Sequence, residues 1–457
     1  MDYVINTDTK NMVSNKERFG YSLGDVASNL TFTLVTTYLM FFYTDVVGLA
    51  PAVVATLFLV ARIWDAINDP IMGIVVDKTD TKWGKCRPWF LWLAIPYGII
   101  AILTFTVPDL SMNGKIIYAY VTYIGLGMIY TGINIPYSAI LPSLTSNVQE
   151  RTEVNAVRMI MAMIGGLIVN MLTMPMVNAL GNGNNEKGFQ MTMIIFASVA
   201  VVLFLITFAS TKERVNFKQD KKQTVRDGFK AIKGNLPWLI SLLINFVFWV
   251  GMTMKTGTIV YYMIYNIGRE DMIPLVMLSI TAGMLPAIAL SPALSKLVKG
   301  KRNTMIVGNI IAIIGTLIMF AAGTNNIGLL IAGNVIGSFG VGFTAGVLFA
   351  VMADTVDYGE WKSGIRAQGL LYAASSFGVK LGMGIGGALS AAILGYVGYI
   401  AGTQQTEAAL AGIRFNIIWM PIIAYIVAIV LLLFYKLDKE QDQMQYELAQ
   451  RRMAHEA

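Results

Sequence analysis

The sequence predicts an all-α membrane protein with twelve transmembrane helices in two six-helix bundles. The chain of 457 residues is 56% hydrophobic and 13% charged, whereas soluble globular domains carry about 25% charged residues. Its apolar residues form runs long enough to cross a hydrocarbon core about 30 Å thick, which takes about 20 helical residues. A polar connection at 211–236 separates six of these runs from the other six.

The twelve apolar runs are expected to be helices, because they lack the alternating pattern and the length of membrane barrel strands. The first twenty residues are polar and contain no apolar core of a cleaved signal peptide, so the first run should remain in the membrane as a span. The expected spans are 22–45, 50–76, 88–107, 115–141, 155–180, 188–210, 237–266, 272–298, 304–322, 327–355, 366–398 and 415–437.

The placement of Lys and Arg predicts that both termini are cytoplasmic. With that orientation, four of the 34 Lys and Arg residues lie on the opposite side, four lie in or beside spans, and 26 lie on the cytoplasmic side. This is the asymmetry of the positive-inside rule. We therefore interpret the net charge of +7 as a topology signal, because the basic residues form no arm or patch of the kind that binds nucleic acid.

The expected organisation follows from these spans. It consists of an N-terminal six-helix bundle (1–210), a cytoplasmic middle loop (211–236), a C-terminal six-helix bundle (237–437) and a cytoplasmic tail (438–457). Two bundles related by an axis along the membrane normal would enclose a central cavity. The middle loop is either a solvated linker or a regulatory or lipid-binding segment.

Several classes of site are excluded by composition. A single cysteine, Cys86, permits no intrachain disulfide, and a single histidine, His455, permits no histidine-based triad, zinc site or intramembrane relay. Glycine-rich stretches at 333–346 and 380–390 lie inside apolar runs without a preceding strand, so they indicate close helix packing rather than dinucleotide binding. We expect no enzymatic activity and no cofactor.

The second span carries three charged side chains, Arg62, Asp65 and Asp69, where a charge costs about 2.5–3.5 kcal/mol on insertion scales. Asp65 and Asp69 are four residues apart and share one helix face, and Arg62 lies on nearly the same stripe. Asn68 adds a neutral oxygen. These oxygens suit a monovalent cation such as Na⁺ at Asp65 and Asp69. The alternative is a permanent salt-bridge network that only holds helices together.

Two lysines lie inside later spans. Lys380, in the eleventh span, is a candidate counter-ion to the two acids, and it could exchange partners when a cation enters or form a static ion pair. Lys255, in the seventh span, could pair with an acid, meet a substrate carboxylate, or extend to an interface.

Hydroxyl, amide and aromatic side chains also collect in the first and fourth spans, at Asn29, Tyr130, Thr131 and Asn134. Dense hydrogen bonding combined with aromatic stacking suits a polyol substrate such as a sugar. The alternative is that these groups only hydrogen-bond between helices.

Longer segments make a family resemblance visible. The run LFLVARIWDAINDPIMG, preceded by YLMFFYTDVVGL and followed by KTDTKWGKCRPW, resembles the glycoside–pentoside–hexuronide:cation symporters of the major facilitator superfamily. The similarity continues through VTYIGLGMIYTGINIPYSAILP and a DYGEW loop at 357–361, and thus covers nearly the whole chain. The family implies the major facilitator fold, and it includes the melibiose permease and carriers of glucuronides and other glycosides.

The resemblance also implies roles for individual residues. It places the cation site at Asp65, Asp69, Asn68 and Thr131. The coupling residues would be Lys380 and Arg62, and the sugar-binding residues Asn29, Tyr130, Asn134, Arg158 and Lys255. The cytoplasmic segment DKTDTKWGKCRP resembles the superfamily's gate motif, which implies gate contacts by Asp77, Lys78, Lys85 and Arg87.

Some positions depart from the family's best-known pattern. Asn29 and Asn134 stand where the melibiose permease has sugar-binding aspartates, and Ser138 and Ala345 stand where it has tryptophans. The sugar site is therefore altered, and melibiose is a poor candidate substrate. Retention of Asn68 is compatible with sodium, but the choice between Na⁺ and H⁺ stays open.

The expected function is symport of Na⁺ or H⁺ with a glycoside (an oligosaccharide, pentoside or glucuronide) by alternating access in a bacterial inner membrane. Its partners would be that small molecule, the cation and membrane lipid. A cation-coupled lysolipid carrier of the same superfamily is the main alternative. A membrane-embedded enzyme would need a nucleophile–base pair in a span, and none is visible in this sequence. A receptor should carry a large soluble signalling domain, whereas the longest polar connection here is 211–236.

Overall fold

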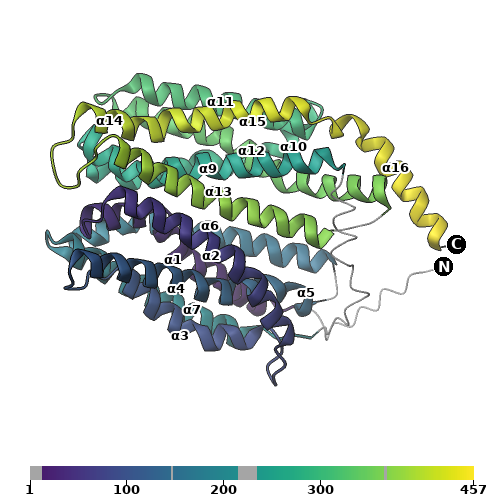
Figure 1. The fold of residues 1–457 in the computed structure, drawn as a ribbon. Helices are drawn as coiled ribbons and strands as arrows, with labels where there is room; N and C mark the ends of the chain where they lie inside the picture. The colour runs from purple at the N-terminus through teal and green to yellow at the C-terminus, as the bar shows by residue number, and fades with distance from the viewer. Residues whose placement is uncertain (1–12, 146–147, 215–233, 365–367, 457) are drawn as a thin grey trace. The chain divides into compact units, whose positions relative to one another are not determined.

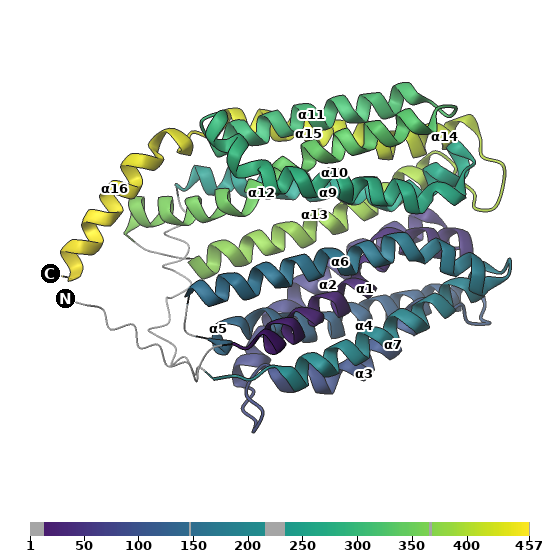
Figure 2. The same cartoon turned by 180° about the vertical axis from the view of Figure 1, so that it is seen from behind.

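The computed structural model describes residues 13–145, 148–214, 234–364 and 368–456. Within them, 12 helices are long and apolar enough to cross a membrane. Figures 1 and 2 show the chain from opposite sides, with helices as the only regular elements of its described residues. The prediction of an all-α protein with twelve spanning helices is confirmed.

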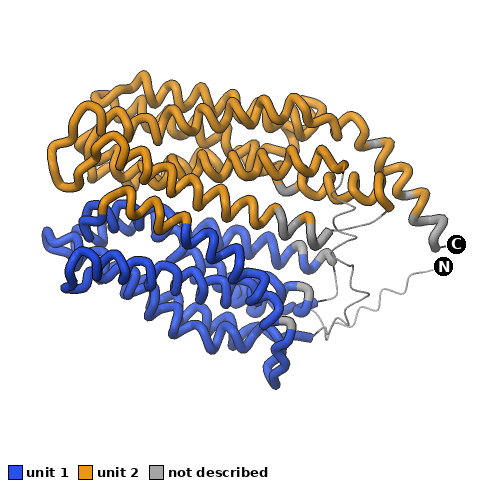
Figure 3. The backbone as a smooth tube through the Cα atoms, viewed as in Figure 1, with its two compact units in different colours: residues 1–49, 60–219 blue, residues 50–59, 220–457 orange. Residues whose placement is uncertain are grey.

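The chain separates into two compact units, coloured blue and orange in Figure 3. The first unit comprises residues 1–49 and 60–219, and the second comprises 50–59 and 220–457. The helix that begins at Pro51 is thus shared, because its first residues group with the second unit and the rest with the first.

In the first unit, one spanning helix ends in a π-helical turn, and a short helix of four residues precedes the fifth span. Its elements are α1 (Asn15–Phe41) with the turn Phe42–Val46, the main part of α2 (Pro51–Lys78), α3 (Arg87–Thr104), α4 (Met112–Ala139), α5 (Leu141–Leu144), α6 (Val148–Gly181) and α7 (Asn185–Ser210).

Small residues allow helices of the first unit to approach closely. A Cβ built on Gly165 of α6 would lie 3.0 Å from Val26 Cα of α1, and one on Gly188 of α7 would lie 2.4 Å from the Val177 oxygen of α6. Because lipid provides no hydrophobic driving force between helices, such close packing supplies much of their association. The contact at Gly165 holds α6 against the part of α1 that carries polar side chains.

The second unit contains the remaining spans and a C-terminal helix. Its elements are α9 (Leu236–Tyr261) with the π-helical turn Tyr262–Ile267, a 3-10 turn (Glu270–Met272), α10 (Ile273–Leu297), α11 (Lys301–Ala322), α12 (Ile327–Ser363), α13 (Gln368–Tyr396), α14 (Glu407–Arg414), the π-helical turn Phe415–Trp419, α15 (Met420–Phe434) and α16 (Leu437–Glu456).

The glycine-rich stretches of α12 and α13 lie at helix–helix contacts, as predicted. A Cβ on Gly340 of α12 would come within 2.4 Å of the Gly308 oxygen of α11. A Cβ on Gly382 or Gly386 of α13 would come within 2.8 Å of a backbone oxygen of α9. Larger side chains at these positions would force the helices apart.

Two of the expected elements differ from the prediction. The first span begins at Asn15 rather than near 22, because Ser14 caps α1 by accepting a hydrogen bond from Glu17 N. The DYGEW segment was expected to be a loop, but α12 continues through it to Ser363. Most of the expected middle loop, 211–236, lies outside the described residues.

The polar tail forms α16, which follows α15 at an angle (Figure 1). Met444 and Leu448 are buried in an apolar cluster of the second unit. Trp361 Nε1 of α12 donates a hydrogen bond of 2.7 Å to Glu447 Oε2 of α16. The tail thus packs against the end of α12, a contact that no local pattern indicates.

Candidate cation and substrate site

The polar and apolar side chains of α2 lie on different faces. Asp65 and Asn68 are only 9% and 8% exposed, whereas Ile63, Ile67 and Ile71 are at least half exposed. This is the reverse of a soluble helix, whose polar face meets the solvent. It fits a helix that presents isoleucines to lipid and turns its acids into the unit.

Asp65 has a cationic partner on its own helix. Arg62 Nη1 lies 2.8 Å from Asp65 Oδ2, and Arg62 Nη2 donates a hydrogen bond of 2.8 Å to the Tyr123 hydroxyl of α4. Arg62 thus bridges α2 and α4 while it neutralises one acid. Arg62, one of the partners that the sequence offers, lies beside Asp65.

Helix α4 approaches both acids with residues one turn apart. Thr131 donates a hydrogen bond of 3.0 Å to Asp69 Oδ1. A Cβ on Gly127, four residues before Thr131, would lie 3.1 Å from Asp65 Oδ1. Asp65 and Asp69 are also four residues apart. Each acid therefore faces one residue of the α4 pair, because one helical turn of α2 lies beside one helical turn of α4.

The donor set suits a small hard cation. Two carboxylates, the Thr131 hydroxyl and the Asn68 amide supply oxygens, which such cations prefer to nitrogen or sulfur. Asn68 Nδ2 is buried without a hydrogen-bond partner among the described residues, so no structural hydrogen bond holds that end of the amide. The described residues contain no group of three or more His, Cys, Asp or Glu that could hold a metal ion.

A second buried ion pair joins α1 and α6. Arg158 Nε lies 2.5 Å from Asp25 Oδ2, and the Arg158 guanidinium stands 4.9 Å from the centre of the Tyr137 ring of α4. Asp25 is 7% exposed. Arg158 was predicted to be a site residue, but its acidic partner was overlooked, although an aspartate inside the first span was itself a signal.

The amide residues predicted to bind sugar lie near this pair. Asn29 Nδ2 donates a hydrogen bond of 2.9 Å to the backbone carbonyl oxygen of Asp25, one turn earlier on α1, and a Cβ on Gly165 would lie 3.1 Å from Asn29 Cβ. Asn134 Nδ2 lies 3.5 Å from the Ser28 hydroxyl. Residues of α1, α4 and α6 are therefore brought together here.

Aromatic rings accompany these polar groups in the same unit. Tyr130 of α4 stacks on Phe32 of α1, with ring centres 5.5 Å apart and an interplanar angle of 19°. Tyr130 also approaches Tyr97 of α3, at 6.4 Å between ring centres. A flat ring beside amides and a guanidinium is the combination that recognises sugars.

The segment that resembles a gate is held by an acid that sequence reasoning missed. Glu213, after α7, accepts hydrogen bonds from the backbone nitrogens of Lys85, Cys86 and Arg87 at 2.8–3.0 Å. These amides lie at the start of α3, where unpaired N–H groups favour a carboxylate. The turn between α2 and α3 is thereby fixed to the end of α7.

The predicted gate side chains make other contacts. Arg87 Nη2 donates to the Phe208 oxygen at 2.9 Å. Lys78 and Lys85 are exposed. The side chain of Asp77 lies outside the described part of the chain.

Lys255 and Lys380 belong to the second unit. Lys255 of α9 is 2% exposed, and its side chain forms no hydrogen bond or ion pair with the described residues. Lys380 of α13 lies between Gly378 and Gly382, on a helix that contacts α9 through both glycines.

Comparison with known proteins assigns the family. Residues 20–439 match the model of the family described as MFS/sugar transport protein. The chain belongs to this family. As a member of the MFS/sugar transport family it is a multi-pass inner-membrane transporter and not an enzyme.

Relatives of this family member align over nearly their whole length. The isoprimeverose transporter of Lactiplantibacillus pentosus is 45% identical over 446 residues, which are 97% of this chain and 93% of the relative. A putative glycoside/cation symporter of Escherichia coli is 33% identical and covers 96% of both chains. A solved bacterial homologue of the human lysosomal transporter Spinster, 15% identical, matches with a TM-score of 0.67 over 93% of this chain and 97% of that one. This likeness shows the transporter fold.

Proposed function

We propose that this protein is a symporter that couples Na⁺ to the uptake of a neutral glycoside by alternating access. The pair of carboxylates on α2 carries this proposal. Asp65 and Asp69 share one face of a spanning helix four residues apart, and α4 contacts both acids. A fixed salt-bridge network has no need for the second acid in the membrane, whereas a cation carrier does.

Sodium is the ion that the donor set fits best. A proton needs only one carboxylate, but here a carboxylate, a hydroxyl and an amide lie within one turn of α2 and the facing turn of α4. We assign the cation site to Asp65, Asp69, Asn68 and Thr131. Arg62 is the resident counter-charge, which a bound ion would partly replace.

The substrate assignment has two supports. Amide groups at Asn29 and Asn134, the Tyr130 ring and the Arg158 guanidinium can bind hydroxyls and stack on a sugar face. In addition, the relatives include a transporter named for isoprimeverose and a putative glycoside/cation symporter. Isoprimeverose is therefore the first sugar to test.

The second unit would complete the cycle. We assign to Lys380 the link between cation and sugar sites that the family resemblance implies, and to Lys255 a contact on the substrate side. Release of Lys380 when the cation binds would raise sugar affinity and allow the loaded carrier to open inward. Both termini would be cytoplasmic, where the segment with Asp77, Lys78, Lys85 and Arg87 would act as the gate.

A lysolipid substrate is not favoured by the family and its relatives, which are named for sugars and glycosides. Membrane lipid therefore enters the proposal as the surrounding solvent and not as cargo.

The decisive experiment adds isoprimeverose to de-energised cells that express the protein, while external sodium and external pH are recorded together. A transient fall in external sodium would support the proposal. A transient rise in pH, with steady sodium, would replace Na⁺ with H⁺. If neither external sodium nor external pH changes with any glycoside of a panel, while the protein is detected in the membrane, symport of a glycoside would be contradicted.

A matched pair of variants separates the mechanism from expression effects. Asp69→Asn should abolish the ion signal, whereas Asp109→Asn, at an exposed connection between α3 and α4, should retain it. Loss of the signal in both variants would indicate damage to the whole protein and would remove the support that Asp69 gives.

A further inference from the structure

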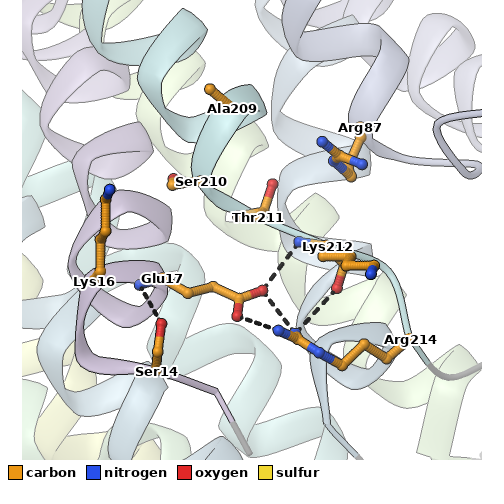
Figure 4. Close-up of a pocket in the computed structure, with 9 residues that line it drawn as sticks. All are labelled: Ser14, Lys16, Glu17, Arg87, Ala209, Ser210, Thr211, Lys212 and Arg214. Atoms are coloured by element: carbon orange, nitrogen blue, oxygen red, sulfur yellow. Dashed lines mark hydrogen bonds and ion pairs between the residues drawn. The ribbon is translucent and has the colours of Figure 1, made fainter. Parts of the chain in front are cut away.

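A cavity of about 420 Å³ lies at the end of the first unit, apart from the polar faces described above. It is formed by the start of α1, the start of α3 and the segment that follows α7 (Figure 4). Its volume is in the range of about 300–1,000 Å³ that is usual for small-molecule sites. Apart from Arg87, none of its lining residues has a part in the proposed transport cycle.

The lining of the cavity is strongly basic. Lys16, Arg87, Lys212 and Arg214 contribute four cationic side chains, and Glu17 contributes the one carboxylate. A concave wall of one sign focuses the field and raises the local concentration of oppositely charged ligands. The cavity therefore favours an anion.

The single carboxylate is already engaged. Glu17 is 4% exposed, accepts hydrogen bonds from Arg214 Nη1 and Nη2 at 2.8 and 2.7 Å, and accepts another from Lys212 N at 3.0 Å (Figure 4). This bidentate pair raises the pKa of Arg214 and holds its guanidinium against α1. Glu17 thus shapes the wall, and Glu213, which is not part of the lining, is the second carboxylate near Arg87.

Three cationic groups remain for a ligand. Lys16 and Lys212 are exposed, and neither ammonium group hydrogen-bonds or pairs with another described residue. Arg87 Nε is buried without a hydrogen-bond partner in the described part of the chain. The N-terminus of α1, capped by Ser14, adds the partial positive charge of a helix end.

The position of the cavity points to the membrane surface. Helices α1 and α3 begin beside it at Asn15 and Arg87, and α7 ends beside it at Ser210. The ends of spanning helices lie at the level of lipid headgroups, where basic pockets between helices bind phosphate-bearing lipids. Several spaced cations suit the several oxygens of a phosphate better than a single carboxylate.

We propose that this cavity is a binding site for a phosphate group, which Lys16, Lys212 and Arg87 hold and which the Glu17–Arg214 pair preorganises. The phosphate is that of an anionic lipid headgroup or of a soluble phosphate ester. Its binding would connect the starts of α1 and α3 to the end of α7, beside the Glu213 contacts that fix the α2–α3 turn.

The test uses the purified full-length protein in nanodiscs of phosphatidylcholine with or without phosphatidylglycerol, and in detergent with or without glycerol 3-phosphate. Bound lipid is counted by native mass spectrometry, and binding of the soluble ester is followed by thermal stability. The double variant Lys16→Gln/Lys212→Gln should bind phosphate about thirtyfold more weakly, because each lysine near the surface contributes about a fivefold factor.

A charge-matched control tests whether the effect belongs to the cavity. Lys82→Gln/Lys439→Gln removes the same charge from two other exposed lysines and should bind like the unmodified protein. Lys16→Arg/Lys212→Arg should retain binding, which would show that the glutamine variant did not simply misfold.

Each outcome has a definite meaning. If the cavity variant, but not the control, loses phosphatidylglycerol binding, the site is supported with lipid as the source of the phosphate. If the cavity variant, but not the control, loses stabilisation by glycerol 3-phosphate, the site is supported with a soluble ester as the source. Equal loss in the cavity variant and the control, or no preference for phosphate ligands in either arm, overturns the proposal.

Discussion

Two acid–arginine pairs of the first unit lie within its spanning helices, and they differ in the groups that surround the acid. Arg62 and Asp65 are neighbours on α2, and a second acid, Asp69, follows one turn later and is contacted by a neutral hydroxyl. Asp25 and Arg158 come from α1 and α6, one charge of each sign, with the Tyr137 ring beside them.

This difference indicates whether the α2 stripe or the Asp25–Arg158 pair can bind a cation. A balanced pair, joined across helices, gains nothing from a further cation, and its natural role is to hold Arg158 in position. The α2 stripe places two acids four residues apart, and like charges at this spacing repel each other until a cation lies between them. We therefore assign the cation to α2 and α4, and the sugar to α1, α4 and α6.

The largest expected effect comes from breaking the balanced pair. Asp25→Asn leaves the Arg158 guanidinium buried without its counter-charge, which should destabilise the protein by about 3–5 kcal/mol. The thermal unfolding temperature in detergent would measure this. The double variant Asp25→Asn/Arg158→Gln should recover part of the loss, because no uncompensated charge remains. Equal temperatures for the single variant and the unmodified protein would contradict the pairing.

Neutralising the second acid of α2 should remove the coupling of ion to sugar. Asp69→Asn should abolish sodium-driven accumulation of the sugar, because no ion would then carry charge inward. One charge moving through 100 mV gains about 2.3 kcal/mol, which corresponds to roughly fiftyfold accumulation. Uptake of labelled sugar into energised vesicles, compared with sugar exchange at equilibrium, would measure the effect. Undiminished accumulation in this variant would remove Asp69 from the mechanism.

A smaller effect should separate the sugar side from the ion side. Asn134→Ala should weaken sugar binding about tenfold, the loss of one or two neutral hydrogen bonds, and should leave sodium affinity nearly unchanged. Titration of uptake against sugar at fixed sodium, and then against sodium at fixed sugar, gives both constants. If sodium affinity falls and sugar affinity does not, Asn134 would belong to the ion site and not to the sugar site.

The smallest effect belongs to an ion pair at the edge of the bundle. Burial acts to raise the pKa of Glu150, but hydrogen bonds from Thr145, Val13 N and Arg18 outweigh it and lower that pKa below its ordinary value. Because the folded pKa is depressed, this stabilisation is present above the unfolded pKa of about 4.3 and is lost as pH falls through the lower folded value.

Thermal unfolding between pH 6 and pH 3 would measure this contribution, which should be below about 1 kcal/mol. Glu150→Gln should flatten that part of the acid dependence. An unchanged acid dependence in this variant would show that other carboxylates account for it.

Much of the fold was predictable because the membrane imposes simple rules. A span needs about 20 apolar residues whatever it packs against, so hydropathy located all twelve. The common face of Asp65 and Asp69 follows from helical periodicity alone. Boundaries that depend on distant contacts were not predictable, such as the helical DYGEW segment, which α16 contacts through Trp361 and Glu447.

The candidate site was predictable in its residue types but not in its pairings. Asp25 and Arg158 are separated by 133 positions, and their contact depends on the close approach of α6 to α1 at Gly165. Glu213 reaches the start of α3 only because α7 ends beside it. A pattern within one helix cannot indicate either contact.

The sequence by itself determined that this protein crosses the membrane with twelve helices and that one of them carries two acids on a single face, because length, hydropathy and helical spacing are local properties. Only the tertiary structure decided that Arg62 neutralises one acid, that Thr131 meets the other, and that Asp25 holds Arg158. The physical reason is that charge compensation in a low-dielectric interior depends on distances of a few ångströms between helices, which packing sets and local sequence does not.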